Sequence, residues 1–286
     1  MRQFSNFVAI DWSGAKTPRQ KGIAVAVCGQ GKAAPSLVNH GIRWSRESVL
    51  EWLNSEAPDN ALIGFDLSPS LPFGGDGFFP GWDRSPGTAK ELWGLVDELC
   101  ADDPHLAASS FVAHPEARRH FRHSKDDCGD MFEPGVGRLR ETERRQAEMG
   151  TSPSSCFNLI GAAQVGKSSL TGMRLLNRLP SSYSVWPFDD IPESGSLIVE
   201  IYTSLAARAG GIRKGLAKMR DGKSLDAALT QLGSQPHVPL AKYDDHSTDA
   251  ILTAAWLRTV AHDPQLWNPP GLDDVRHTEG WTFGVV

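Results

Sequence analysis

Valine, isoleucine and other apolar residues gather in short segments along the first third of the chain. Three of these segments, Phe7–Asp11, Gly22–Cys28 and Leu37–Trp44, are separated by stretches that contain glycine, proline and lysine. This pattern is typical of β-strands joined by hairpin connections, so we predict an antiparallel meander. After Ser45 the apolar positions recur at helical spacing, which predicts a helix capped by Ser45 with one buried face.

A fourth apolar segment, Ala61–Asp66, follows the predicted helix. A helix between two strands carries the chain back across the sheet, and a right-handed crossover then makes the fourth strand a parallel neighbour of the first. The next strand-like segment is Ser196–Tyr202, and the last strong helical pattern begins near Asp245. We therefore predict an α/β fold with a mixed five-stranded sheet, in which three antiparallel strands are followed by parallel strands and helices flank the sheet.

A long interval rich in glycine and proline, residues 67–196, separates the fourth and fifth predicted strands. A capping box at Thr88–Glu91 predicts one helix in it. The other helices expected there begin near Pro115, Arg138 and Ser168. An interval of this length is typical of an inserted, mostly helical cap or lid within a single domain that spans 1–286. The glycine-rich segment Phe73–Trp82 is predicted to be a flexible flap.

The composition is that of a globular protein, since 40% of the 286 residues are hydrophobic and 22% are charged. This excludes a disordered chain and a collagen-like repeat. No apolar run approaches the roughly 18 to 20 residues needed to cross a bilayer, and the first residues lack the apolar segment of a signal peptide. We therefore expect a cytoplasmic protein without a membrane partner. The formal net charge of -5 argues against coating of nucleic acid by bulk electrostatics but allows a local basic groove.

Four acidic residues lie at positions where they could bind a metal ion. Asp11 ends the first predicted strand and Asp66 ends the fourth, and neighbouring strands lie only about 4.8 Å apart, so both side chains can point into one volume. Glu200 lies in the fifth predicted strand. Asp249 lies one turn into the last helix, with His246 on the same side. Carboxylates brought together repel one another unless cations separate them, and such hard oxygen ligands suit Mg²⁺ or Mn²⁺.

Two such ions, about 3.5 to 4 Å apart, are what a two-metal nuclease uses. We therefore predict a divalent-metal-dependent phosphodiesterase that acts on nucleic acid, with His246 orienting the attacking water. The predicted metal ligands are Asp11, Asp66, Asp249 and Glu200. Each acid also has a structural alternative: an aspartate at a strand end often serves a turn or cap, Glu200 could pair with an arginine, and Asp245 could be an N-cap.

The chain resembles the domain-of-unknown-function 429 group of predicted RNase H-like nucleases over nearly its whole length. The segments that carry the resemblance are FVAIDWSGAK, LIGFDLSPSLPF, FNLIGAAQVGKSSLTGM, IVEIYTSLAAR and HSTDAILTAAWL. The resemblance implies an RNase H-like fold with site acids at Asp11, Asp66, Glu200 and Asp249. It also implies that His246 and Asp249 take the HxxDA form seen in some four-way-junction resolvases, and a homodimer is possible because RNase H-like resolvases are often dimers.

The chain departs from the family pattern at Thr203, where proline is expected just after the segment that contains Glu200. By composition alone, Asp244 and Asp245 are alternatives to Asp249 as the ligand on the last helix. The sequence context DA favours Asp249.

A second motif points to phosphate binding. Residues Gly161–Ser168 match the P-loop expression GxxxxGK[ST], in which Lys167 would reach nucleotide phosphates and Ser168 would hold Mg²⁺. The context favours a structural turn, because a P-loop opens a parallel sheet and only one strong strand follows here. The segment Ile10–Lys16 loosely resembles the first phosphate loop of actin-like ATPases. ATP-dependent phosphotransfer is therefore one alternative to a nuclease, and a catalytically inactive RNase H-like binding domain is another.

Basic residues form two clusters in the interval and one after it. The first two are Arg118, Arg119, Arg122 and Lys125, and Arg138, Arg140, Arg144 and Arg145. These side chains either line a groove for a phosphate backbone or form solvated ion pairs. The segment Arg208–Lys223 is strongly basic and follows the strand that contains Glu200. Trp12 and Trp82 could stack on nucleic-acid bases, although burial is the more common role of tryptophan.

Overall fold

The computed structural model describes residues 2–38, 43–161, 165–212 and 219–286. Within these ranges the chain forms a six-stranded sheet in the order β3-β2-β1-β4-β6-β5. The strands are β1 (Asn6–Asp11), β2 (Ala24–Gly29), β3 (Ser36–Leu37), β4 (Ala61–Asp66), β5 (Ser184–Val185) and β6 (Leu197–Glu200). β2 is antiparallel to both β1 and β3, whereas β1, β4, β6 and β5 run parallel. The α/β class and the mixed sheet are therefore confirmed.

The sheet has one strand more than the five that we predicted. β5 is two residues long and pairs with the outer edge of β6; such a short segment within 67–196 carries no periodic signal. β3 is shorter than the predicted strand Leu37–Trp44, of which residues 39–42 lie outside the described residues. Trp44 is not part of the sheet: it is buried, and its carbonyl oxygen accepts a hydrogen bond from the Gln20 amide at 2.7 Å.

The helices begin close to the positions that the sequence indicates. The Ser45 side chain caps α1 (Arg46–Ser55) by accepting from the Ser48 amide at 3.0 Å, and Thr88 caps α2 (Ala89–Leu99). The remaining helices are the 3-10 helix η1 (Pro104–Leu106), α3 (Ser109–Ala113), α4 (Pro115–Arg118), α5 (Glu141–Glu148), α6 (Val165–Asn177), α7 (Thr203–Ala209), α8 (Gly222–Gln231), α9 (Asp245–Val260), α10 (Pro264–Trp267) and α11 (Leu272–Val275). Within the described ranges, no helix combines the length and the apolar composition that crossing a bilayer requires.

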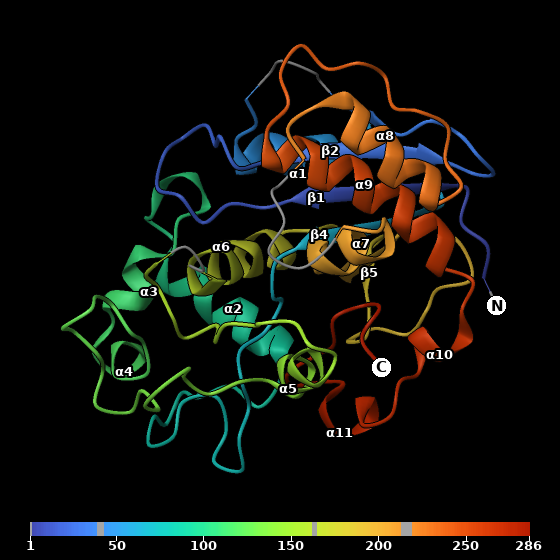
Figure 1. Cartoon of the computed structure of the whole chain (residues 1–286). Coiled ribbons are helices and arrows are strands. Elements are labelled where there is room, and N and C mark those ends of the chain that lie inside the picture. The colour runs from blue at the N-terminus through green and yellow to red at the C-terminus, as the bar shows by residue number, and fades with distance from the viewer. Residues whose placement is uncertain (1, 39–42, 162–164, 213–218) are drawn as a thin grey trace.

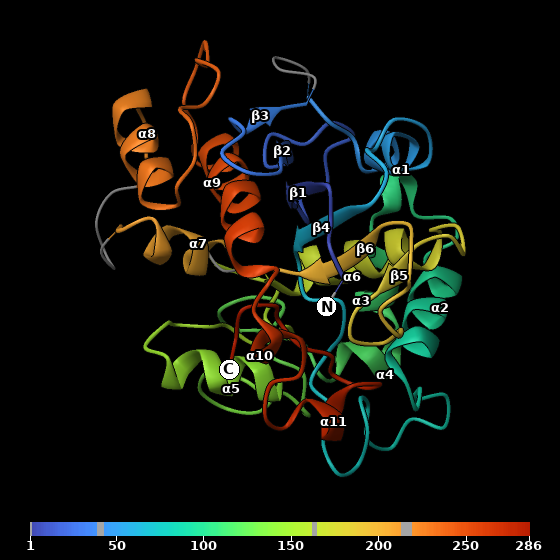
Figure 2. The same ribbon diagram turned by 90° about the vertical axis from the view of Figure 1, so that its right-hand side faces the viewer.

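The sheet separates two hydrophobic layers, because alternate residues of each strand point to opposite faces. Val8, Ile10 and Ile63 face one layer, where they pack with α1, α2 and α6. Phe7 and Ala9 face the other layer, which contains α7, α8 and α9. Figure 1 shows α9 lying along β1 and β2, and Figure 2 shows the two groups of helices on opposite sides of the strands.

Residues 67–196 contribute α2 to α6, so they build most of the first layer. The predicted flexible flap Phe73–Trp82 is wrong: Phe78 and Phe79 are fully buried, and Trp82 is only 9% exposed. Their rings join an aromatic cluster with residues of α3 and of the following loops. Trp12 is buried as well, with its indole nitrogen donating to Thr171 at 3.1 Å. Burial of apolar ring area therefore decides the position of these side chains, although Trp12 also lines a cavity at the end of β1.

His120 in this aromatic cluster makes the stability sensitive to acid. It is 4% exposed, and its ring lies 5.2 Å from that of Phe79. Burial, and then the charges of Arg138 and Arg119, lower the pKa of His120 to about 4. The unfolded chain binds a proton on this histidine near pH 6.5, whereas the folded chain does not. The free energy of unfolding therefore falls as the pH drops from about 6.5 towards 4.

We expect His120→Gln to remove this part of the acid sensitivity. Between pH 7 and pH 5 the wild type should lose about 2 kcal/mol more stability than the variant, as measured by urea unfolding at both pH values. Equal losses in the two proteins would show that His120 does not titrate in this way.

Candidate functional site

Three of the predicted site acids lie at the carboxyl-terminal ends of neighbouring strands of the sheet. Asp11 and Asp66 are direct partners in the parallel register of β1 and β4. Glu200 ends β6 and is paired with Phe65, the residue before Asp66. All three are therefore at the carboxyl ends of neighbouring parallel strands, which is where open α/β sheets bind their ligands.

The electrostatic environment of Asp66 links it to the other acids. Burial raises the pKa of Asp66 well above its usual value, and the negative charge of Asp11 adds to this shift. The charges of Asp249 and Glu200 raise the same pKa further. Because each of these effects requires proximity, the sheet edge and the second turn of α9 share one negatively charged region.

His246 contacts this region through Asp11. The Nδ1 atom of His246 lies 3.1 Å from Oδ1 of Asp11. Asp11 is buried, whereas the side chain of His246 is 44% exposed. The hydrogen bond to Asp11 raises the pKa of His246 against the opposing effect of burial. A Cβ added at Gly22 would lie 3.2 Å from the imidazole ring, so this glycine gives the ring its space.

The structure also distinguishes the three aspartates at the start of α9. Asp244 is the N-cap, and its side chain accepts from the Ser247 amide at 3.0 Å. Asp245 lies 3.5 Å from the guanidinium of Arg220. Of these three aspartates, Asp249 is the one whose charge is among the resolved causes of the raised pKa of Asp66. Of the three aspartates, Asp249 therefore agrees best with the predicted ligand on the last helix.

Glu200 has an arginine partner. Both carboxylate oxygens accept hydrogen bonds from Arg140, at 2.6 and 2.9 Å, and Thr282 donates a further bond at 2.8 Å. Arg140 is completely buried and also contacts Glu143 at 2.6 Å. Burial raises the pKa of Glu200, while the charge of Arg140 acts in the opposite direction. Glu200 thus has the ion pair that the sequence left open as the alternative to metal ligation.

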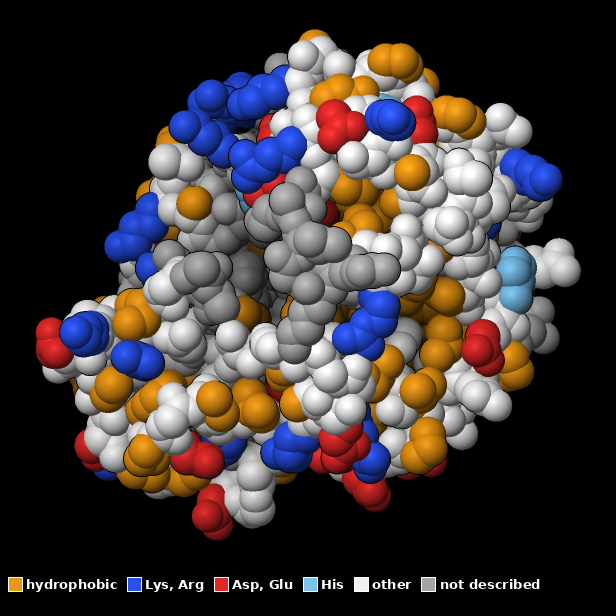
Figure 3. Space-filling view, viewed as in Figure 1, with side chains coloured by type: hydrophobic (Ala, Val, Ile, Leu, Met, Phe, Trp, Pro, Cys, Tyr) orange, Lys and Arg blue, Asp and Glu red, His pale blue; other side chains and the backbone are white. Residues whose placement is uncertain are grey.

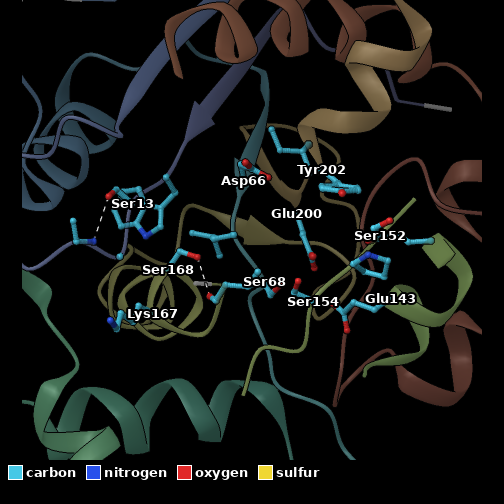
Figure 4. A pocket seen from close by; sticks show the side chains of 18 residues that line it. Ser13, Asp66, Ser68, Glu143, Ser152, Ser154, Lys167, Ser168, Glu200 and Tyr202 are labelled. Atoms are coloured by element: carbon cyan, nitrogen blue, oxygen red, sulfur yellow. Dashed lines mark hydrogen bonds between the residues drawn. The ribbon is translucent and has the colours of Figure 1, made fainter. Parts of the chain in front are cut away.

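A cavity of about 470 Å³ opens at this edge of the sheet. Its lining includes Asp66, Ser68 and Glu200 from the strand ends and Glu143 from α5. Lys167 and Ser168 of α6 lie on its other side, and Figure 4 shows the residues around the opening. We call this space the acid cavity. It brings two of the predicted metal ligands, Asp66 and Glu200, together with Lys167 and Ser168 of the P-loop match. Asp11, Asp249 and His246 are not among its described lining residues.

The P-loop match lies only partly within the described residues, because 162–164 fall outside them. Lys167 is the third residue of α6, and the Ser168 hydroxyl donates to the Val165 carbonyl at 2.8 Å. The segment before the motif, 150–161, contains an isolated bridge at Asn158 but no strand. A strand should lead into a true P-loop, so this part of the structure agrees with the structural alternative.

The carboxylates that are free of arginine partners limit which cation the site could hold. Within the described parts of the chain, no three or more His, Cys, Asp or Glu side chains form a group that could hold a metal ion. Mg²⁺ commonly binds through only one or two carboxylates and keeps several waters. Asp11 and Asp66 offer two such carboxylates on adjacent strands. Glu200 does not fit as a ligand of a second ion, because both of its oxygens already accept from Arg140.

No protein-family model matches the sequence, and the comparisons with curated proteins and with solved structures also found no match. The interpretation of the site therefore depends on its geometry and chemistry.

The sequence did not reveal the role of Arg140. We grouped it with Arg138, Arg144 and Arg145 as a groove or a solvated face. Arg144 is exposed, Arg145 is partly exposed and both pair with Glu141, whereas Arg138 is partly buried and donates to the Phe78 carbonyl. The i, i+3 spacing of Arg140 and Glu143 was the sequence feature that could have indicated an ion pair of Arg140. The partner Glu200 is 60 residues away in sequence, so the pattern alone could not identify it. Arg118 pairs with Asp127 on the surface, which agrees with the ion-pair alternative for the first basic cluster.

Arg140→Met should destabilise the protein strongly. The substitution would leave the buried carboxylates of Glu200 and Glu143 without their cation, which typically costs about 3 to 5 kcal/mol. Arg144→Met is the matched control, because the exposed pair of Arg144 with Glu141 contributes less than about 1 kcal/mol. Urea unfolding of both variants measures the difference. Similar small losses in the two variants would show that Arg140 is not needed to neutralise the buried acids.

Proposed function

We propose that the protein is a divalent-cation-dependent nuclease that hydrolyses phosphodiester bonds of nucleic acid. The observation that supports this most directly is the placement of Asp11 beside Asp66, with the charge of Asp249 acting on Asp66. Several half-buried carboxylates repel one another, and a cation between them would turn this unfavourable arrangement into a binding site. We infer that Asp11 and Asp66 hold one Mg²⁺ or Mn²⁺.

The strand order supports an RNase H-like fold as part of this proposal. Three antiparallel strands, then a helix, then parallel strands and a final helix with an aspartate form the order that the family resemblance implies. β1, β2, β3, β4 and β6 follow it, with β5 added at the edge. Fold similarity alone does not establish an activity, so the proposal depends on the acids rather than on the topology.

The residues of this chain would have separate roles in hydrolysis. Bound Mg²⁺ or Mn²⁺ supplies Lewis acidity and lowers the pKa of a coordinated water. His246, held by its hydrogen bond to Asp11, would orient the attacking water or accept its proton. Lys167 on the opposite wall of the acid cavity contributes positive charge towards a phosphate group. Two hydrogen bonds from Arg140 fix the position of the Glu200 carboxylate, which lines the acid cavity.

Cleavage of labelled DNA and RNA, single-stranded, double-stranded and branched, tests this proposal. We expect cleavage with Mg²⁺ or Mn²⁺ and none with EDTA. Asp66→Asn and Asp11→Asn should each reduce the rate at least about 100-fold, because the cation contributes several kcal/mol to the transition state. The matched control is Asp273→Asn, an exposed aspartate in α11 whose side chain is 80% exposed.

Three results would count against the proposed nuclease. Cleavage that persists in Asp66→Asn would have another source. Hydrolysis of ATP that requires Lys167, without cleavage of any nucleic acid, would instead favour the phosphotransfer alternative. Absence of both activities would favour a binding domain without catalysis.

A further inference from the structure

A second cavity adjoins the acid cavity at the connection between β1 and β2. It has a volume of about 710 Å³ and shares the lining residues Ser13 and Ala15 with the acid cavity. We call it the Arg19 pocket. Its described lining also includes His246, whose Nδ1 atom lies 3.1 Å from Oδ1 of Asp11. The Arg19 pocket therefore lies directly beside the predicted site.

The lining of the Arg19 pocket is basic. Its described residues include Arg19, Lys21 and Arg43 but no aspartate or glutamate. In the described part of the chain, none of these three side chains has a carboxylate oxygen within 4.0 Å, and every aspartate and glutamate of the sequence lies in that part. The positive charge of this pocket is therefore not neutralised by an ion pair within the chain.

Hydrogen bonds hold the two basic segments in place. Arg19 and Lys21 are exposed, whereas Gln20 between them is only 1% exposed. The Gln20 amide donates to the Trp44 carbonyl at 2.7 Å, and the Arg19 guanidinium donates to the Arg43 carbonyl at 3.2 Å. The connection between β1 and β2 is thus fixed to the segment before α1, and the three cations form one surface.

Gly22 brings this surface close to His246. A Cβ added at Gly22 would lie 3.2 Å from both the imidazole ring and the Ser13 hydroxyl. The absence of a side chain therefore allows the end of the connection to approach the first turn of α9. As a result, the basic surface ends at the histidine that contacts Asp11.

Lysine and arginine side chains gather at the upper left of the molecular face in Figure 3, and the connection between β1 and β2 lies on the same side in Figure 1. The cations of the Arg19 pocket come from this connection and from the segment before α1. This side of the molecule is therefore positively charged, although the formal net charge of the chain is -5. Such a local positive region attracts anions.

The other lining residues indicate which kind of anion fits. Small-molecule sites are lined mostly by apolar and aromatic side chains, but the apolar side chains described here are those of Ala15 and Pro18. Proteins that hold single strands stack the bases on aromatic rings, and the aromatic ring in the described lining is that of His246, which is bonded to Asp11. A duplex keeps its bases stacked inside and presents its phosphates, so it matches this lining best.

We propose that the Arg19 pocket binds the phosphate backbone of a nucleic-acid duplex, beside the bond that is cut and without reading the base sequence. This inference rests on the nuclease function proposed above, which makes the neighbouring acids the place of cleavage. Lysine and arginine contacts to phosphates fix the position of a duplex but carry no sequence information. Arginine is well suited to this role because its planar fork matches the geometry of phosphate.

Binding in EDTA tests this inference without catalysis. Fluorescence anisotropy over a range of salt concentrations would use labelled DNA and RNA duplexes of about 20 base pairs, each in two unrelated sequences, and the matching single strands. We expect a duplex to bind more tightly than its single strands, and the two sequences to bind within about 2-fold of each other. Combining Arg19→Gln, Lys21→Gln and Arg43→Gln should weaken duplex binding at least about 10-fold and reduce the salt slope by about 2 to 3, since each lost phosphate contact contributes about 0.9.

The matched control combines Arg84→Gln, Lys90→Gln and Arg144→Gln. It removes the same net charge, but each of these side chains pairs with an acid and none is among the described lining of the Arg19 pocket. Its salt slope should stay within about 0.5 of the wild-type value. The double variant Arg19→Lys with Arg43→Lys keeps the charges and should retain most of the wild-type slope, which separates loss of charge from damage to the loop.

Three results would overturn the inference. These are wild-type duplex affinity in the triple variant of the pocket, an equal loss in the control variant, and single strands that bind as tightly as duplexes. The nuclease function is judged separately by the cleavage assay. If duplex binding depends on the pocket but no nucleic acid is cleaved, the binding site is supported and the nuclease function fails. If cleavage depends on Asp66 while the pocket variants bind normally, the nuclease function stands and this inference fails.

Discussion

The parallel pairing of β1 with β4 is the constraint on which the site depends. It makes Asp11 and Asp66 direct neighbours, and a change of register by one residue would turn Asp66 to the opposite face of the sheet. The register is fixed by apolar residues that alternate between two buried layers. The hydrophobic core therefore holds two carboxylates together at the sheet edge against their repulsion. Such electrostatically unfavourable groups are more common at functional sites than elsewhere.

Acids at the same edge of the sheet have different partners. Glu200 is neutralised inside the protein by Arg140, with Thr282 completing its hydrogen bonds. This network joins the end of β6 to α5 and to the C-terminal segment, so it supports the structure around the site. Asp66 lines the acid cavity together with Glu200, but its pKa is raised by burial and by other acids. Because both oxygens of Glu200 already accept hydrogen bonds from Arg140, we expect one cation instead of two.

Parts of the fold and site could be predicted because their signals are local. Ala61–Asp66 is a continuous apolar run, as expected for a central parallel strand buried on both faces, and Ser45 and Thr88 cap helices through contacts with residues three positions away. The errors concern contacts between distant residues. Glycines in Phe73–Trp82 indicated flexibility, but the aromatic side chains of that segment are buried against a different part of the chain. Arg140 lay in a basic cluster, and its buried partner could be identified only after folding.

Cation binding to the folded protein tests the central claim most directly. Calorimetric titration with Mn²⁺ and thermal unfolding with and without the ion would compare the wild type with Asp66→Asn. We expect one ion per chain and a wild-type melting temperature that rises by several degrees at saturation. Asp66→Asn should be more stable than the wild type without the ion, because one repelling charge is gone, and should respond little to Mn²⁺. Equal responses of the two proteins, or none in either, would contradict the claim that these carboxylates form a cation site.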